Sequence, residues 1–334
     1  MIESVQFKNF KVLRDATLPL GRFTLIVGPN GSGKSTALQA LSVAAFPVAV
    51  EFDKIVSARP LLNGTEVEIV VRRRNPRPDE LKRIWRRGQA WAPSQKRRFL
   101  EDGVVPSLSL EQELQRSRVY SFDPQSMVNP VSLEPNMRLD FKGGNLTGIL
   151  DQMQDHDPER FELLNEELKR WFPEFERVLF DTPSTGAKIF FLRARQGRYK
   201  IPAGNLSQGT LLALALLTLA YLPEPPTIVG LEEPDRGIHP RLLRRIQDAL
   251  YRLSYPENFG EKREPVQVIA TTHSPYFLDL YKDHPEEIVI AQKTEDGARF
   301  ERLSDHPDIE EILEDAPLGD VWFSGILGGV PAEQ

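Results

Sequence analysis

The run from Gly28 to Thr36 has the residue types of a phosphate-binding loop. It reads GPNGSGKST and matches the pattern G-x-x-x-x-G-K-[ST]. Glycines let successive backbone N–H groups turn inward around phosphate oxygens, and a helix that starts near Lys34 adds the positive end of its dipole. The Lys34 ammonium can reach the outer phosphates and the Ser35 hydroxyl can ligate magnesium. We therefore expect ATP and Mg²⁺ at this loop, with nucleotide contacts from Gly28, Pro29, Asn30, Gly31, Ser32, Gly33, Lys34, Ser35 and Thr36.

Two carboxylates, Glu232 and Glu233, follow the apolar stretch 227–231. Alone, such a pair is typical of a solvated strand end. In a chain that carries a phosphate loop, one carboxylate can hold magnesium and its neighbour can polarise the attacking water. We assign Glu232 to magnesium and Glu233 to the water.

The phosphate loop needs a strand before it and a helix after it. The apolar run 22–28 predicts that strand, and the pattern over 34–45 predicts that helix. Strands and helices alternate at both ends of the chain, which favours a mostly parallel sheet. Residues 144–180 have a helical pattern with a break at Pro173. The other predicted strands are 65–71, 118–122, 188–193, 227–231, 266–271 and 287–291, and the other predicted helices are 158–171, 208–222 and 240–254.

Three further motifs, together with the loop, resemble those of ABC-type ATPases in order and spacing. LSQG at 206–209 resembles the signature motif, which begins a helix. EEPDRGIHP at 232–240 resembles the acidic strand end and D-loop, and VQVIATTHSP at 266–275 resembles the H-switch. The resemblance implies an α/β fold: a P-loop NTPase of the ABC-ATPase type, with a mixed, mostly parallel sheet and an inserted helical lobe.

Within that superfamily the chain resembles the SMC/RecF-like branch, which includes OLD-type and compact single-domain ATPases. The similar stretches are ESVQFKNFKVLRDATLPL at 3–20, GIHP, TTHSP and PLGDVWFSGILGG at 317–329. The resemblance implies one ABC-type ATPase domain over 1–334. Within that domain we expect a basic insertion at 72–116 and a helical signature lobe at 126–204.

The resemblance also implies residue roles and a second copy of the chain. Ser207, Gln208 and Gly209 should contact the γ-phosphate of ATP bound by the other copy, and Asp235 should lie at the dimer seam. His273 should contact the γ-phosphate or the attacking water. Two copies related by a two-fold axis would then hold two ATP molecules between them.

The metal site has two open questions. The family usually has Asp where Glu232 stands, and the extra methylene moves the carboxylate outward. Gln125, in RVYSFDPQ, is our candidate for the Q-loop residue that contacts magnesium, and an exposed loop glutamine is an equally open alternative.

The segment 72–98 is strongly basic and contains Trp85 and Trp91. It carries 11 Lys/Arg and 2 Asp/Glu, so its net charge is +9, whereas the whole chain has −6 and the remainder therefore −15. Basic side chains bind phosphates and indole rings can stack on bases. The segment is our candidate DNA contact, with a docking site for an acidic partner protein or a solvated charged surface as the alternatives.

Composition excludes several other classes of function. The chain has no cysteine, which removes disulfides and thiolate chemistry. The longest apolar stretch, 211–222, is too short to cross a bilayer, so we expect a cytoplasmic protein with no membrane insertion. Three hypotheses remain: an ATP-gated dimer that works with DNA in repair, chromosome maintenance or anti-invader defence; a regulatory ATPase that switches a separate effector protein; and a transporter motor.

Overall fold

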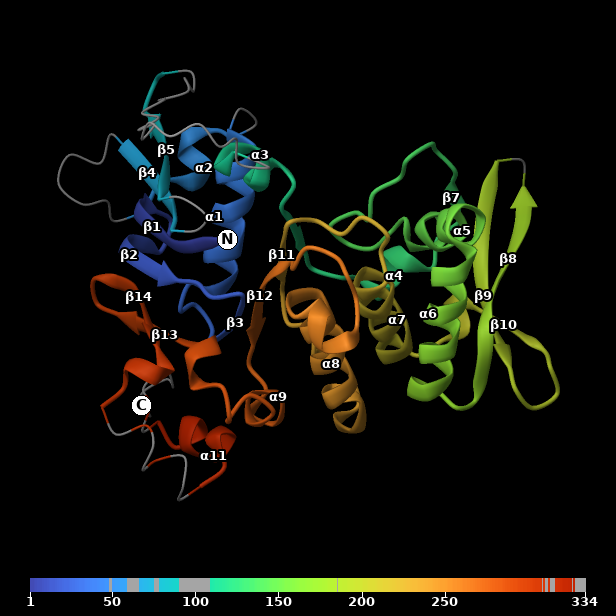
Figure 1. The fold of residues 1–334 in the computed structure, drawn as a ribbon. Helices are drawn as coiled ribbons and strands as arrows, with labels where there is room; N and C mark the ends of the chain where they lie inside the picture. Colours follow the sequence, from blue (N-terminus) through green and yellow to red (C-terminus); the bar gives the residue numbers. More distant parts are fainter. Residues whose placement is uncertain are drawn as a thin grey trace. The chain divides into compact units, whose positions relative to one another are not determined.

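The computed structural model describes residues 1–47, 50–58, 66–74, 78–89, 109–184, 186–307, 309, 312, 316–325 and 327. The chain divides into two compact units (Figure 1). We call residues 1–119, 226–232 and 264–334 the phosphate-loop unit, and residues 120–225 and 233–263 the signature unit. The predicted boundaries 72–116 and 126–204 stay predictions.

A six-stranded sheet forms the base of the phosphate-loop unit. Its order is β14-β13-β3-β12-β11-β6. Strands β13, β3, β12 and β11 run parallel, and β14 pairs antiparallel with β13. Every residue of β3, β11 and β12 is buried, which explains why these strands read as continuous apolar runs. The bounds are β3 (Phe23–Val27), β6 (Arg118–Tyr120), β11 (Ile228–Leu231), β12 (Gln267–Thr272), β13 (Ile288–Thr294) and β14 (Gly297–Arg302).

A second, antiparallel sheet in this unit has the order β2-β1-β4-β5. It contains β1 (Ile2–Phe10), β2 (Leu13–Pro19), β4 (Glu66–Arg73) and β5 (Asp79–Arg86). Strand β5 lies in the predicted basic insertion 72–116, within which the sequence predicts no strand. Its inward side chains are buried by pairing with β4, so the charges of this hairpin lie on a regular sheet.

Helix α1 (Lys34–Ala45) shares one apolar core with side chains of both sheets. Leu38 of α1, Phe7 of β1 and Ile269 of β12 belong to this core, and none of them is exposed. The helix that follows the phosphate loop is therefore fixed by packing along its length. The remaining helices of the unit are α2 (Phe52–Ile55), α3 (Leu110–Gln115), α9 (Pro275–Asp279) and α11 (Leu318–Phe323), with 3₁₀ turns at Pro285–Glu287 and Leu303–Asp305.

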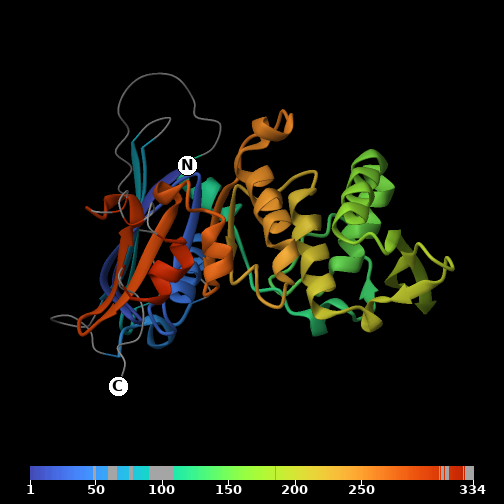
Figure 2. The same cartoon turned by 90° about the horizontal axis from the view of Figure 1, so that it is seen from below.

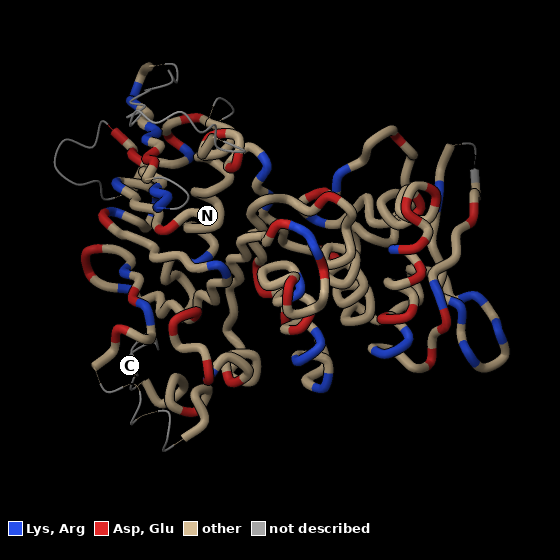
Figure 3. Tube along the Cα trace, in the orientation of Figure 1, with Lys and Arg blue, Asp and Glu red and all other residues tan. Residues whose placement is uncertain are grey.

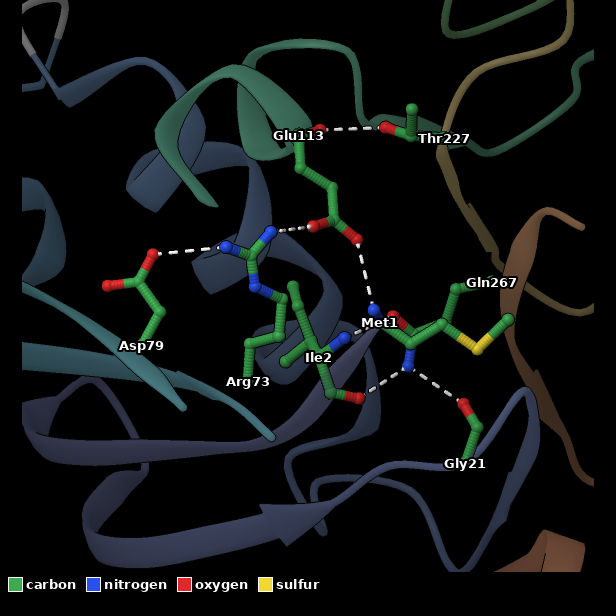
Figure 4. A network of polar contacts seen from close by, with 8 residues as sticks. All are labelled: Met1, Ile2, Gly21, Arg73, Asp79, Glu113, Thr227 and Gln267. Atoms are coloured by element: carbon green, nitrogen blue, oxygen red, sulfur yellow. Dashed lines mark hydrogen bonds and ion pairs between the residues drawn. The ribbon is translucent and has the colours of Figure 1, made fainter. Parts of the chain in front are cut away.

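A polar network joins the starts of β1, β5 and β12 to the end of β4 (Figure 4). The Gln267 side chain accepts a hydrogen bond from Ile2 N at 2.9 Å and donates to the carbonyls of Ile2 and Gly21, both at 2.7 Å. The Arg73 guanidinium contacts Glu113 at 3.0 Å and Asp79 at 3.2 Å. These contacts tie β1, β4 and β5 to the start of β12, at the edge of the sheet opposite the phosphate loop.

The signature unit combines helices with a small antiparallel sheet. Strand β9 (Ala187–Ala194) pairs with β7 (Val131–Ser132), β8 (Phe175–Ser184) and β10 (Lys200–Pro202). Helices α5 (Leu146–His156) and α6 (Pro158–Trp171) lie along one side of the long β8–β9 hairpin in both views (Figures 1 and 2). The unit also contains α4 (Pro124–Met127), α7 (Gln208–Ala220) and α8 (Leu243–Ser254), with 3₁₀ turns at Ala203–Asn205, Pro240–Leu242 and Pro256–Phe259.

The prediction of helix throughout 144–180 is wrong beyond Trp171. Residues from Phe175 form β8 because alternate side chains pack on α6: Val178 is buried and Phe180 lies against Phe161 with ring centroids 6.0 Å apart. The Asn165 side chain also accepts the Val178 N–H at 2.9 Å. Tertiary packing thus decides the strand.

The apolar stretch 211–222 is a core helix, as its length suggested. Residues 210–220 of α7 are all buried in the signature unit. Within the residues that the structure describes, no helix combines the length and the apolar character needed to span a membrane.

Candidate nucleotide-binding site

The Lys34 ammonium is already directed into the phosphate loop. It donates to the carbonyls of Gly28 at 2.8 Å and Pro29 at 2.9 Å, and only 5% of the residue is exposed. Burying a lysine amine is costly unless its hydrogen bonds are satisfied. The loop therefore holds a positive charge in place, which suits a loop that binds phosphate.

Two glycines of the loop occupy positions that no other residue fits. A Cβ on Gly28 would lie 2.2 Å from the Ala291 carbonyl oxygen of β13. Gly33, which precedes α1, has φ +95°, and a Cβ there would lie 2.8 Å from Leu13 Cδ2. The close backbone approach and the left-handed turn are what a cradle of inward N–H groups requires.

The Ser32 hydroxyl also suits a loop that binds phosphate. It is fully buried and has no hydrogen-bond partner among the residues that the structure describes. A buried hydroxyl without a partner costs free energy unless a ligand supplies one. Ser35 is exposed at the first turn of α1 and Thr36 is half-buried. The glycine cradle, the Ser32 hydroxyl and the Lys34 ammonium together fit a phosphate group.

The parallel register brings three predicted site residues to one edge of the sheet. Val27 pairs with Thr272, so Gly28 and His273 leave adjacent strands at the same level. Leu231 pairs with Ala270, so Glu232 follows on the next strand along. Strand β12 lies between β3 and β11, so the strand that ends in Glu232 is not the direct neighbour of the phosphate-loop strand. The chain inserts β12 between them when it returns to the sheet at 264–267.

His273 sits in a short, well-fixed connection. The Ser274 N–H donates to Thr272 Oγ1 at 2.9 Å, and the Ser274 hydroxyl caps α9 by accepting from Phe277 N at 3.2 Å. His273 is half-buried. A strand end and a capped helix thus limit where His273 can move.

Helix α11, in the described part of the motif PLGDVWFSGILGG, packs on α9, the helix that follows His273, and the sequence did not reveal this contact. Gly319 of α11 donates its N–H to the Asp279 carboxylate of α9 at 2.6 Å. A Cβ on Gly319 would lie 2.6 Å from the Pro275 carbonyl oxygen. Only a glycine lets α11 come this close to Pro275, and Gly319 therefore holds α11 against α9.

Glu233 has an unusual backbone conformation. Its φ is +45°, in the left-handed region that side chains with a Cβ rarely adopt. Its carboxylate is 35% exposed and lies 3.9 Å from Arg236 Nη1. Glu232, one residue earlier, is half-buried at the end of β11. Strained residues of this kind cluster at functional sites.

The signature residues lie at the start of α7 in the signature unit. Ser207 is the N-cap of α7: its hydroxyl accepts the Thr210 N–H at 3.1 Å. Ser207 and Gln208 are both exposed. A Cβ on Gly209 would lie 2.6 Å from the Gly237 carbonyl oxygen, so the signature motif packs directly on the D-loop that contains half-buried Asp235.

Gln125 is exposed on the short helix α4, also in the signature unit. Its backbone N–H donates to the Asp123 carboxylate at 3.1 Å. The Ser126 hydroxyl and this N–H hold the pKa of Asp123 below its usual value. The assignment of the Gln125 side chain to magnesium stays a prediction.

The basic segment 72–98 is described only in part, and Trp91 lies outside the described residues. Trp85 is 3% exposed and donates its indole N–H to the Pro47 carbonyl, so a base-stacking role for Trp85 is wrong. The described cations of the segment are neutralised by nearby carboxylates. The pairs are Arg72 with Glu80, Arg73 with Asp79 and Glu113, Arg74 with Glu3, Lys82 with Glu68, Arg83 with Glu111, Arg86 with Glu66 and Arg87 with Asp53.

The mixed sheet and the phosphate loop at its carboxyl edge define the fold of a P-loop ATPase. Residues 68–279 match the family described as "AAA domain, putative AbiEii toxin, Type IV TA system", and residues 1–55 match "AAA ATPase domain". Since the first match covers more than half of the chain, the protein belongs to that family.

The similar proteins are of two kinds: solved structures with a similar fold and proteins with a similar stretch of sequence. The SMC head domain of Pyrococcus furiosus, solved with the C-terminal domain of ScpA, superposes with a TM-score of 0.63 at 13% identity, over 94% of this chain and 99% of that one. The OLD nuclease of Thermus scotoductus is 54% identical over 43 residues, 13% of this chain and 8% of the nuclease. The nickel import ATP-binding protein NikO of Rhodobacter capsulatus is 50% identical over 52 residues, 14% of this chain and 20% of NikO. The chain thus spans a small part of either sequence relative, and the SMC likeness shows the fold.

Proposed function

We propose that this protein binds and hydrolyses ATP, and that two copies close around the nucleotide and act on or with DNA. The observation that carries the proposal is the shared sheet edge, where the parallel register brings together Gly28, Glu232 and His273. A phosphate cradle, a carboxylate and an imidazole at one edge are the groups that phosphoryl transfer to water requires.

Each residue has a role in this scheme. The N–H groups of 28–33 and the Lys34 ammonium hold the phosphates and offset the charge that develops in the transition state. Glu233 accepts the proton of the attacking water, and His273 positions the γ-phosphate or that water. Ser35, Glu232 and Gln125 would hold Mg²⁺, which supplies charge neutralisation to the phosphate oxygens when bound.

A second copy completes the site. Ser207 and Gln208 stand at the N-terminus of the 13-residue helix α7, whose dipole favours an anion. We propose that this end of α7, with Gly209, contacts the γ-phosphate held by the other copy, and that Asp235 lies at the seam. The γ-phosphate then controls whether the assembly is open or closed.

The family description narrows the biological role. It names a putative toxin of a type IV toxin–antitoxin system. Of repair, chromosome maintenance and anti-invader defence, we therefore favour defence, in a cytoplasmic protein. The alternative function is a regulatory ATPase that switches a separate effector protein without touching DNA, and the neutralised charges of the β4–β5 hairpin favour it over DNA contact through that hairpin.

The direct test is the turnover of Glu233→Gln. The variant should bind ATP as tightly as the wild type, because the phosphate loop is intact, and should hydrolyse it about 100-fold more slowly. Phosphate release and equilibrium binding of a fluorescent ATP analogue measure the two steps separately.

Lys34→Ala is the matched control, since it should lose ATP binding itself. Normal turnover by Glu233→Gln would show that Glu233 is not the residue that activates water. Wild-type protein that binds ATP without releasing phosphate would contradict the proposed ATPase activity.

A further inference from the structure

The turn between β9 and β10 concentrates unbalanced positive charge in the signature unit. From residue 182 to residue 223 the sequence has no Asp or Glu but five Lys and Arg. Residues 195–200 are all exposed. Figure 3 shows this turn mostly in blue, whereas the β4–β5 hairpin alternates between blue and red.

The cations at the tip of this turn lack the neutralising partners that β4 and β5 provide. Lys188 and Arg193, on β9 below the tip, pair with Asp151 at 2.9 Å and Glu176 at 3.2 Å. Arg195, Arg198 and Lys200 form no ion pair with any part of the chain that the structure describes. Three cations within six residues repel one another in the free protein, and a bound polyanion would relieve that repulsion.

The turn also holds its cations in a defined geometry. Lys200 pairs across the ladder with Arg193, and the Ala194 N–H donates to the Tyr199 carbonyl at 2.9 Å. Gly197 and Arg198 have φ of +73° and +51°, which produces a tight reversal of the chain. Arg198 thus occupies a conformation in which Asn or Gly is more favourable, as occurs where function decides the residue.

An aromatic ring lies among these cations. The Tyr199 side chain is 60% exposed, and its ring lies beside Gly197, where an added Cβ would be 3.2 Å from Cδ1. An exposed aromatic ring next to unpaired cations is the combination that binds nucleic acid: cations contact the phosphates and the ring stacks on an unpaired base.

We propose that the β9–β10 turn is a nucleic-acid contact site, in which Arg195, Arg198 and Lys200 bind the DNA backbone and Tyr199 stacks on an unpaired base. The inference rests on the proposed action on DNA and moves its main contact from the segment 72–98 to the signature unit. The described cations of 72–98 form ion pairs within the protein. Among the described residues Arg195, Arg198 and Lys200 form none, and Lys200 Nζ lies 5.6 Å from the centroid of the Phe191 ring.

The test compares two triple variants with the same net charge. Arg195→Gln, Arg198→Asn and Lys200→Gln remove three cations from the turn, and Asn keeps the left-handed conformation accessible at 198. The control removes three paired cations through Arg74→Gln, Arg86→Gln and Arg87→Gln. Binding to fluorescent single-stranded and duplex oligonucleotides is measured by anisotropy between about 50 and 200 mM salt.

The turn variant should bind at least about tenfold more weakly at the lowest salt, and its log–log salt dependence on duplex DNA should become shallower by about 0.9 for each phosphate that is no longer neutralised. The control should bind nearly as the wild type does. Tyr199→Ala should weaken binding to single-stranded DNA about fivefold or more and leave duplex binding unchanged. ATP turnover without DNA, measured on the same variants, should match the wild type.

Equal affinity of the turn variant and the wild type would overturn the assignment of the turn while leaving the action on DNA intact. An equal loss in the control would also overturn it, because net charge alone would then explain binding. A wild type that binds no DNA at low salt contradicts both the turn site and the proposed action on DNA, but leaves the ATPase assignment to its own test.

Discussion

Glu233 carries the clearest sign of function at the level of a single residue. Its backbone has φ +45°, a conformation in which Asn or Gly would be less strained. The residue nonetheless carries a carboxylate directly after the magnesium candidate Glu232. We propose that at Glu233 stability is given up for activity, because the conformation costs stability and the carboxylate is suited to activating water.

The left-handed backbone of Glu233 leads to a prediction about stability that does not depend on ATP turnover. Glu233→Asn should raise the free energy of unfolding by about 0.5–1 kcal/mol, because Asn adopts the left-handed conformation more readily. The same variant should be inactive in hydrolysis. Urea denaturation measures the first effect and phosphate release the second.

Glu232→Asn is the control, since Glu232 does not have a positive φ. It should give no gain in stability. A Glu233→Asn variant that unfolds more easily than the wild type would mean that the Glu233 side chain stabilises the fold, and would weaken its assignment to catalysis.

The sequence predicts the backbone of a site residue where a local pattern determines it. In the phosphate loop, Gly33 has a left-handed φ and a Cβ on Gly28 would meet the Ala291 carbonyl of β13, so both positions need glycine. That these residues bind nucleotide stays a prediction. Trp85 is the opposite case. Its indole is buried against Pro47, which is distant along the chain, and composition alone made it look like a stacking surface.

At the level of elements, the polar network of Figure 4 maintains the sheet register on which the site depends. Arg73 on β4 reaches Asp79 at the start of β5 and Glu113 on α3, and the side chain is 5% exposed. The Thr227 hydroxyl, just before β11, donates to the Glu113 carbonyl at 2.7 Å. Arg73, although it belongs to the basic segment 72–98, therefore holds β4 to β5 and α3.

Replacing Arg73 by Met should lower the free energy of unfolding by about 3 kcal/mol, because the partly buried Glu113 carboxylate loses its guanidinium partner at 3.0 Å and keeps the Met1 ammonium at 3.6 Å. Arg72→Met is a matched control on the same strand. Arg72 pairs with Glu80 near the surface, where such pairs contribute about 0–1 kcal/mol. Urea denaturation measures the loss of unfolding free energy in both variants. Equal losses in Arg73→Met and Arg72→Met would contradict this role of Arg73.

Two of the strands that the sequence did not predict, β5 and β8, share one physical cause. Strands β5 and β8 are polar or follow a helical pattern, and only pairing with β4 and β9 makes them strands. The continuous apolar runs of β3, β11 and β12 were predictable because both of their faces are buried. Pairing between distant segments is not encoded in local periodicity, so the order that puts β12 between β3 and β11 was not predictable either.

For the molecule as a whole, we propose that one copy of the chain binds the nucleotide incompletely. The phosphate loop belongs to one compact unit, and the signature residues belong to the other, where Gln208 is exposed beside the N-cap Ser207. ATP would then act as the link between two copies, and hydrolysis would separate them.

The most direct measurement of this claim is the mass of Glu233→Gln in solution, by light scattering, with and without saturating ATP and magnesium. We predict twice the monomer mass with ATP and the monomer mass without it. Adding Ser207→Arg to this variant should keep ATP binding and abolish the dimer. A Glu233→Gln protein that stays monomeric with ATP bound, or a double variant that dimerises as well as the single one, would contradict the account.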